Sequence, residues 1–129
     1  GHAPGFWSHI SGDEKYATES YPTGEVVAGG RVPDMLRRYS NLYADLSAGS
    51  ARNALERDMV HARQFVLEFQ DRLLYARDGF GAELDALLEQ LSLPNDVLSK
   101  LQADNARYLL SANQAPQTQT PSGADPTDN

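Results

Sequence analysis

The chain lacks three features that would narrow its class: cysteine, long apolar runs and an excess of basic residues. Without cysteine, it can form neither a disulfide framework nor a thiolate metal site. No apolar run approaches the roughly 18 residues of a membrane-spanning helix, and the first residues do not resemble a signal peptide. The 11 Lys and Arg are outnumbered by 18 Asp and Glu, which gives a formal net charge of −7. Because nucleic acids and anionic membranes attract basic patches, we expect neither as a partner. Since neither a membrane span nor a signal peptide is recognisable, we expect a cytoplasmic protein.

Length limits the architecture. At 129 residues, the chain is expected to form one domain at most. Residues 113–129 contain three prolines and no large apolar side chain. Such a segment cannot bury enough surface to offset the entropy that it would lose on ordering. We therefore predict a folded region over residues 1–112 and a disordered tail over residues 113–129.

Residues 41–80 contain the clearest structural pattern, which is a strand, a helix and a second strand. Two apolar runs, at 42–46 and 73–76, flank a segment with helical periodicity over 52–70. Four apolar residues of that segment lie at positions i, i+3, i+4 and i+7, which indicates one buried stripe: Ala62, Phe65, Val66 and Phe69. A crossover of this length between two short apolar runs predicts a βαβ unit with parallel strands.

The segments on either side are predicted to be helical after an irregular start. The first 30 residues are rich in glycine and polar residues, which predicts a long loop whose aromatic side chains pack on another element. Helices are predicted over 33–39, 82–91 and 95–110 from the positions of proline and the spacing of apolar residues.

Four segments together resemble one protein family. GHAPGFW at 1–7 is similar to a strand end with a histidine followed by a glycine and proline turn. NLYADLSAGS at 41–50 and DRLLYARD at 71–78 are similar to two later strands, and NARYLL at 105–110 is similar to a final helix. This order and spacing resemble the C-terminal third of the amidohydrolase-related (amidohydrolase 2) family of metal-dependent hydrolases and decarboxylases.

The resemblance implies a fold and a missing part. The family fold is a distorted (β/α)8 barrel, and a closed barrel takes about 250 residues. The expected fold class is therefore α/β: a partial (β/α)8 TIM barrel made of the last two to three βα units, with a long N-terminal loop and a disordered C-terminal tail. The family's His-x-His metal ligands are absent, because the chain's histidines are His2, His9 and His61. We therefore expect the chain to be the C-terminal portion of an enzyme and to be inactive alone.

The same resemblance implies catalytic and metal-binding roles for Asp78 and His2. Asp78 matches the family's eighth-strand aspartate, which binds the metal or takes a proton from the metal-bound water and passes it to the leaving group. His2 matches the sixth-strand histidine, which binds a metal or polarises the substrate or water. The expected cofactor is a divalent metal, Zn first, with Mn or Fe as alternatives. From spacing alone, Asp78 could instead cap the following helix, and His2 could have no role.

Four further residues are candidates for substrate binding: Asp45, Arg77, Trp7 and His9. Asp45 could orient a substrate or a histidine ligand, or it could accept hydrogen bonds from loop amides. Arg77 could hold a substrate carboxylate with its planar fork, or it could pair with a neighbouring acid. Trp7 could wall a pocket for an aromatic substrate, or it could pack the loop, and His9 could line the pocket or be solvated.

Three other polar residues are expected to have structural roles. His61 lies on the helix between the two predicted strands and is expected to be structural. Asn105 and Arg107 are expected to hold the last helix through hydrogen bonds to the backbone.

Two functions from different classes follow. The first is a metal-dependent enzyme of the amidohydrolase family, a hydrolase or decarboxylase of a small-molecule substrate. The second is a non-catalytic α/β interaction or assembly fragment, because two strands and a few helices leave sheet edges and apolar faces exposed. Such a fragment would form a homo-oligomer or bind a second polypeptide.

Overall fold

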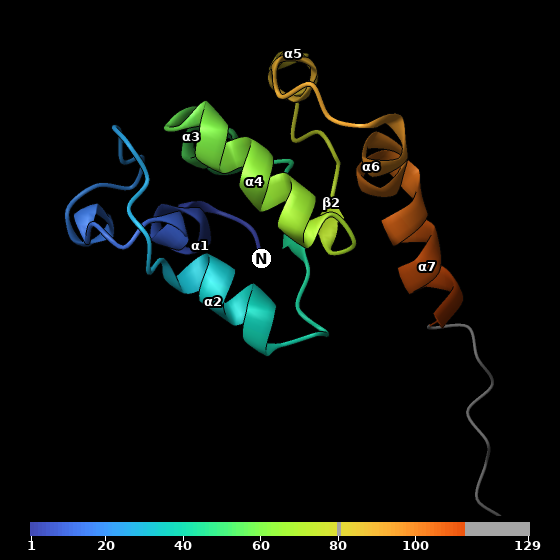
Figure 1. The fold of residues 1–129 in the computed structure, drawn as a ribbon, viewed down its shortest axis with the longest axis horizontal. Coiled ribbons are helices and arrows are strands. Elements are labelled where there is room, and N and C mark those ends of the chain that lie inside the picture. Colours follow the sequence, from blue (N-terminus) through green and yellow to red (C-terminus); the bar gives the residue numbers. More distant parts are fainter. Residues whose placement is uncertain (80, 113–129) are drawn as a thin grey trace, which may run out of the picture.

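The computed structural model describes residues 1–79 and 81–112 and shows a mainly helical molecule (Figure 1). Of these residues, 57% are helical and 4% lie in strands, and the strands form one two-stranded sheet. The predicted fold class, an α/β partial (β/α)8 TIM barrel, is therefore wrong. The predicted tail at 113–129 lies outside the described residues.

The two strands are β1 (Ala44–Asp45) and β2 (Leu73–Leu74), and they pair in parallel. Their register places Ala44 opposite Leu73. The parallel pairing across a helical crossover was predicted, but each strand is shorter than the apolar run that suggested it. A residue counts as part of a strand only where a neighbouring strand bonds to it. The apolar runs therefore indicated burial more than strand length.

Gly1 bonds to the other edge of β1. Its terminal ammonium donates to the carbonyl oxygen of Tyr43 at 2.5 Å, and its carbonyl oxygen accepts the backbone N–H of Asp45 at 2.7 Å. One residue that bonds to both neighbours of Ala44 in this way forms a bridge of the parallel type. The sheet therefore has a third parallel position, which Gly1 alone occupies among the described residues.

The outer edge of β2 is contacted by the C-terminal helix α7 (Asn105–Ala112), which follows helix α6 (Asn95–Ser99). A π-helical segment, η3 (Lys100–Asp104), joins them. The carbonyl oxygen of Leu101 in this segment accepts the backbone N–H of Tyr75 at 2.9 Å. The wider turn thus coincides with a helix carbonyl bonded to a strand rather than along the helix.

Asn105 anchors α7 to the sheet. Its side chain is buried, and Nδ2 donates to the carbonyl oxygens of Gln70 at 2.7 Å and of Leu73 at 2.8 Å. This confirms the role expected for Asn105. Arg107 does not share it, because its Nη1 pairs with the exposed carboxylate of Asp104 at 3.2 Å.

The crossover between the strands contains two helices, where one was predicted over 52–70. These are α3 (Gly49–Glu56) and α4 (Met59–Phe69). The break falls at Asp58, whose carboxylate caps α4 by accepting the backbone N–H of His61 at 2.9 Å. An aspartate just before the first turn of a helix with an apolar stripe is a common N-cap signal. The stripe itself is buried as predicted: Ala62, Phe65, Val66 and Phe69.

The N-terminal segment is more ordered than the loop predicted for it. It contains α1 (Pro4–Trp7) and two 3-10 turns, η1 (Ser8–Ile10) and η2 (Lys15–Ala17). Trp7 is fully buried, so α1 contributes to the core. Helix α2 (Arg31–Arg38) follows, and α5 (Glu83–Gln90) lies between β2 and α6.

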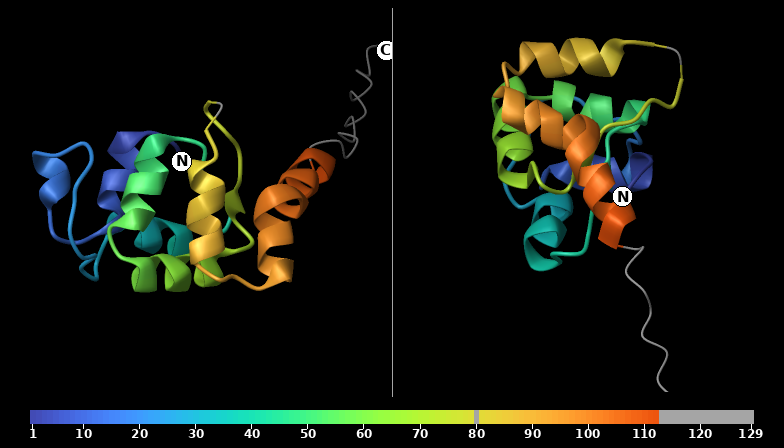
Figure 2. Two further views of the ribbon diagram at one scale, coloured as in Figure 1. Left: turned by 90° about the horizontal axis from the view of Figure 1, so that it is seen from above. Right: turned by 90° about the vertical axis from the view of Figure 1, so that its right-hand side faces the viewer.

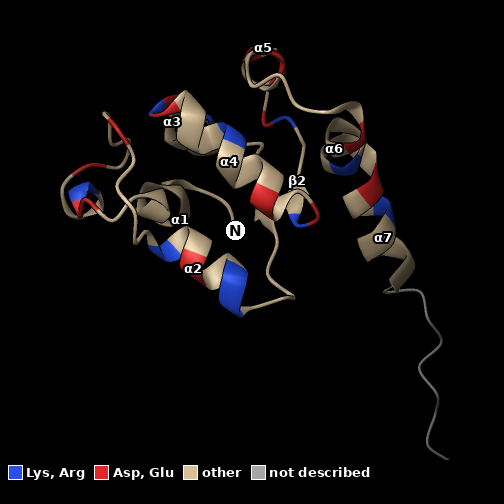
Figure 3. Cartoon of the chain, viewed as in Figure 1, with Lys and Arg blue, Asp and Glu red and all other residues tan. Residues whose placement is uncertain are grey.

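Two further views show the arrangement of the helices (Figure 2). The segment with η2 and the helices α6 and α7 lie at opposite ends of the molecule. One apolar core joins the elements between them, and its largest fully buried members include Trp7, Ile10, Leu36, Leu55, Phe69 and Leu73. Basic residues are interspersed with acidic ones along the helices (Figure 3). Across residues 1–79 and 81–112, no helix has the length and apolar character needed to cross a membrane.

Candidate functional site

The candidate site lies at the C-terminal ends of the parallel backbone segments. Gly1 and β2 bond to opposite edges of β1, and all three run in the same direction. The residues that follow them therefore emerge at one end of the sheet. His2 follows Gly1, Asp45 ends β1, and Asp78 lies in the segment after β2. The topology thus brings the predicted catalytic residues and Asp45 to the same end of the molecule.

His2 and Asp45 are in contact. Nδ1 of His2 lies 3.4 Å from Oδ2 of Asp45, and both side chains are partly exposed. The other oxygen, Oδ1, accepts the backbone N–H of Ser47 at 2.7 Å, which fixes the carboxylate. Both interpretations of Asp45 therefore have a contact here: it accepts a loop amide and it lies beside a histidine. An imidazole oriented through Nδ1 keeps Nε2 for a metal or substrate.

A serine is close to the same imidazole nitrogen. Oγ of Ser47 lies 3.4 Å from Nδ1 of His2. In a Ser-His-Asp catalytic triad, serine and aspartate contact different nitrogens of the ring. Because Ser47 and Asp45 share Nδ1 here, the arrangement does not activate Ser47 as a nucleophile.

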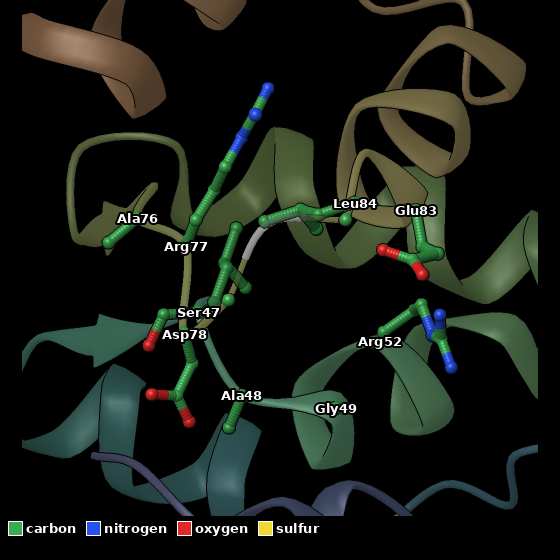
Figure 4. A pocket seen from close by; sticks show the side chains of 12 residues that line it. Ser47, Ala48, Gly49, Arg52, Ala76, Arg77, Asp78, Glu83 and Leu84 are labelled. Atoms are coloured by element: carbon green, nitrogen blue, oxygen red, sulfur yellow. The ribbon is translucent and has the colours of Figure 1, made fainter.

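Asp78 lines a cavity of about 280 Å³ at this end of the sheet (Figure 4). In this view its carboxylate extends beside Ala48, whereas the Arg77 side chain extends in the opposite direction. Asp78 does not cap the following helix, because α5 has Ala82 at its N-cap position and no side-chain cap. The alternative role weighed for Asp78 is therefore wrong in this structure. Within the described ranges, no hydrogen bond or ion pair joins Asp78 to His2.

The described residues hold at most part of a metal site. Among residues 1–79 and 81–112, no three His, Asp or Glu side chains lie close enough together to hold an ion. An imidazole and a carboxylate are suitable Zn²⁺ ligands, but a catalytic zinc site uses three protein ligands. The donor types therefore fit the expected metal, while their number does not complete its coordination.

Arg77 is held by α5 and its neighbours. Nε donates to the Tyr75 hydroxyl at 2.9 Å, and Nη2 pairs with the carboxylate of Asp85. The Tyr75 hydroxyl in turn donates to Asp85 at 2.6 Å. Of the two interpretations of Arg77, the structure thus shows the pairing with an acid and no free fork for a substrate.

Trp7 and His9 do not line the cavity. Trp7 is fully buried beside Phe65, and its Nε1 donates to the backbone oxygen of Asp45 at 3.1 Å. It therefore supports the site from the core. The His9 ring lies 4.0 Å from the Tyr16 ring, and desolvation followed by the charge of Arg31 lowers the pKa of His9. His9 is thus a packed residue of the N-terminal segment.

Two charged residues of the cavity, Arg52 and Glu83, were not predicted from the sequence. Arg52 lies in the first turns of α3, and Glu83 is the first residue of α5. Their position just after the two strand-to-helix loops was a usable signal. In parallel sheets, such loops border binding sites.

No family model, curated protein or solved structure matches the chain. The resemblance to amidohydrolases accordingly depends on the four sequence segments alone.

Proposed function

We propose that this chain is the C-terminal portion of a metal-dependent enzyme related to the amidohydrolases. The whole enzyme would hydrolyse or decarboxylate a small organic molecule. The observation that carries the proposal is the contact between His2 and Asp45 at the end of the sheet where Asp78 also emerges. Metal-binding imidazoles commonly have a carboxylate beside the ring nitrogen that does not bind the metal, and Asp45 lies in that position.

Each residue of the site would have a role that follows from its chemistry. A bound divalent metal would lower the pKa of a water molecule toward neutrality. Asp78 would accept the proton from that water and pass it to the leaving group, as a carboxylate within hydrogen-bond reach can do. Asp45 would hold the proton of His2 on Nδ1, so that Nε2 presents its lone pair to the metal or the substrate.

The proposal leaves part of the site to residues beyond those described. Zn²⁺ is the first candidate metal, with Mn²⁺ or iron as alternatives, because imidazole and carboxylate suit all three. With two candidate ligands, the chain alone would bind metal weakly and would not turn over substrate. A cytoplasmic location is part of the same proposal.

Zinc titration calorimetry tests the proposal. The chain should be acetylated at Gly1, because a free terminal amine beside His2 would itself bind zinc. Weak binding of one zinc ion is expected, and both His2→Gln and Asp78→Asn should lower the affinity at least tenfold. His61→Gln and Asp96→Asn, which change the same residue types away from the site, should leave it unchanged. Equal affinities in all five proteins would contradict the proposal.

One observation favours the second function, an assembly fragment. Among the described residues, the outer edge of β1 is bonded to Gly1 and to the Trp7 side chain and pairs with no further strand, whereas the outer edge of β2 is contacted by α7. An incompletely paired edge accepts further strands. Light scattering after gel filtration separates the two functions: a stable homo-oligomer without zinc affinity would support assembly and contradict the enzyme.

A further inference from the structure

The cavity at the end of the sheet is lined by charged side chains of both signs. Its volume of about 280 Å³ lies at the lower limit of ligand pockets, so a ligand must be small. Its walls include apolar and charged side chains from the segments after both strands and from α5: Leu46, Ala48, Arg52, Asp78, Glu83 and Leu84.

Arg52 supplies the positive charge. Its Nε atom is shielded from solvent and has no hydrogen-bond partner. The carboxylate it pairs with in α3 is that of Glu56, whose Oε1 lies 3.6 Å from Nε, too far for a hydrogen bond. An anion in the cavity would therefore bond to the accessible part of the guanidinium group, which is partly exposed and lines the cavity.

The second arginine of the cavity does not compete for such an anion. Arg77 already bonds to Tyr75 and Asp85, and its side chain extends away from the Asp78 carboxylate (Figure 4). Arg52 is therefore the lining cation whose bonding capacity is least used. It also lies near the start of α3, where the helix dipole favours negative charge.

Glu83 supplies the negative charge on the same side of the cavity. In Figure 4 its side chain lies on the same side of the view as that of Arg52. Nevertheless, among residues 1–79 and 81–112 no ion pair within 4 Å joins Glu83 to Arg52. A molecule that carries one charge of each sign could bond to both side chains. A simple carboxylate would bond to Arg52 but would be repelled by Glu83.

We propose that the cavity binds a small amino acid or an amino-acid end of a substrate. Its carboxylate would bind Arg52, its ammonium group would bind Glu83, and a short apolar side chain would lie against Leu46 and Leu84. As a statement about the substrate, this inference rests on the proposed function, because it places the ligand in the cavity that Asp78 lines. The binding itself requires no metal.

Three probes of matched shape test the binding. L-Norvaline carries both charges, pentanoate lacks the ammonium group, and butylamine lacks the carboxylate. Each is titrated into the full chain in the presence of a metal chelator, and backbone amide shifts are followed by NMR. We expect norvaline to bind most tightly and to shift amides around Gly49 and Gly81, which both line the cavity.

Variants assign the two charges. Arg52→Gln should lower the affinity for norvaline and for pentanoate at least tenfold and leave the affinity for butylamine unchanged. Glu83→Gln should lower the affinity for norvaline and for butylamine. It should not lower the affinity for pentanoate. Arg63→Gln and Glu89→Gln, which change exposed residues outside the cavity, should alter nothing. If Arg52→Gln does not fold, Arg52→Lys keeps the charge but loses the planar fork of the guanidinium group and should still lower the affinity for norvaline.

The inference is overturned if norvaline causes no saturable shifts, or if its affinity does not depend on Arg52. Its failure is distinguishable from that of the proposed function. Norvaline binding in a chain without zinc affinity would support the cavity inference and contradict the metal site. Zinc binding that depends on Asp78, in a chain that does not bind norvaline, would support the metal site and contradict the cavity inference.

Discussion

The guanidinium group of Arg57 forms an ion pair with the carboxylate of Asp13, across 44 positions of sequence. The Arg57 side chain is 1% exposed, and it also donates to the backbone oxygens of Gly24 at 2.9 Å and Glu25 at 3.2 Å. One side chain thus ties the N-terminal segment to the end of α3. This explains why glycine-rich residues that predict a loop adopt a defined path.

Arg57→Gln should destabilise the protein, because it leaves the nearly buried Asp13 carboxylate without its partner. Breaking such a pair costs about 3 kcal/mol. Chemical denaturation measures the loss, and hydrogen exchange should show faster opening of residues 11–29. Arg63→Gln, at an exposed position of α4, serves as the matched control and should change stability little. Equal stability of the two variants would contradict the role of Arg57.

The same pair should make stability depend on pH in the acid range. Desolvation alone would raise the pKa of Asp13, but hydrogen bonds from Arg57 and Lys15 and their charges outweigh it and lower the pKa. The stabilisation is therefore fully present above the unfolded pKa of about 3.9 and is lost as the pH falls through the folded pKa. Denaturation at several pH values should show the difference between wild type and Arg57→Gln shrinking below about pH 4. A difference independent of pH would contradict this assignment.

Asn105→Leu should loosen the C-terminal helices from the sheet. The change removes two hydrogen bonds and leaves the carbonyl oxygens of Gln70 and Leu73 without this donor. Unsatisfied buried groups of this kind cost about 2–3 kcal/mol together. Thermal unfolding should show a clear fall in Tm, whereas Gln102→Leu, an exposed change in the same helical segment, should not.

His61 should contribute a second pH dependence, near neutrality. Desolvation, partly offset by Asp58, lowers the pKa of this histidine below its usual value. Its neutral form therefore stabilises the fold fully above the unfolded pKa of about 6.5, and this contribution is lost as the pH falls toward the folded pKa. Urea denaturation between pH 7.5 and pH 5 should show a smaller loss of stability for His61→Gln than for wild type. An unchanged slope would contradict the assignment.

Local features of this protein were predicted from the sequence more accurately than its fold class. The stripe of Phe65 and Phe69 was recognisable because helical spacing of apolar residues depends on near neighbours. The parallel pairing of the two strands was likewise implied by the short crossover, whereas the register that places Ala44 opposite Leu73 was not predicted. The barrel was wrong because most of the described residues lie in helices and the sheet contains two short strands.

In the candidate site, too, some features were predicted from the sequence and others were not. The sequence placed His2, Asp45 and Asp78 after parallel segments, and the structure brings all three to one end of the sheet. It could not show that Arg77 is held by Asp85, because that pair depends on how α5 packs. Nor could it show that Trp7 belongs to the core, since aromatic residues in a loop favour packing and binding equally.

Asp45→Asn should weaken zinc binding without unfolding the chain. Asparagine is close in shape to aspartate but cannot hold the Nδ1 proton of His2 as strongly. Loss of a carboxylate that orients a histidine ligand typically lowers metal affinity 10- to 100-fold. Calorimetry on the chain acetylated at Gly1 measures the change, with Asp34→Asn, an exposed aspartate of α2, as control. Unchanged affinity would show that Asp45 does not act through His2.

The most direct test of the central claim is the position of a bound metal relative to His2 and Asp78. Mn²⁺ added in small amounts to the labelled, acetylated chain broadens the NMR signals of nearby residues. If His2 and Asp78 share a metal, the signals around positions 2, 45 and 78 should broaden together, and this broadening should be lost at all three positions in Asp78→Asn. Broadening confined to positions 1 and 2, with the signals around Asp78 unaffected, would contradict a shared metal site.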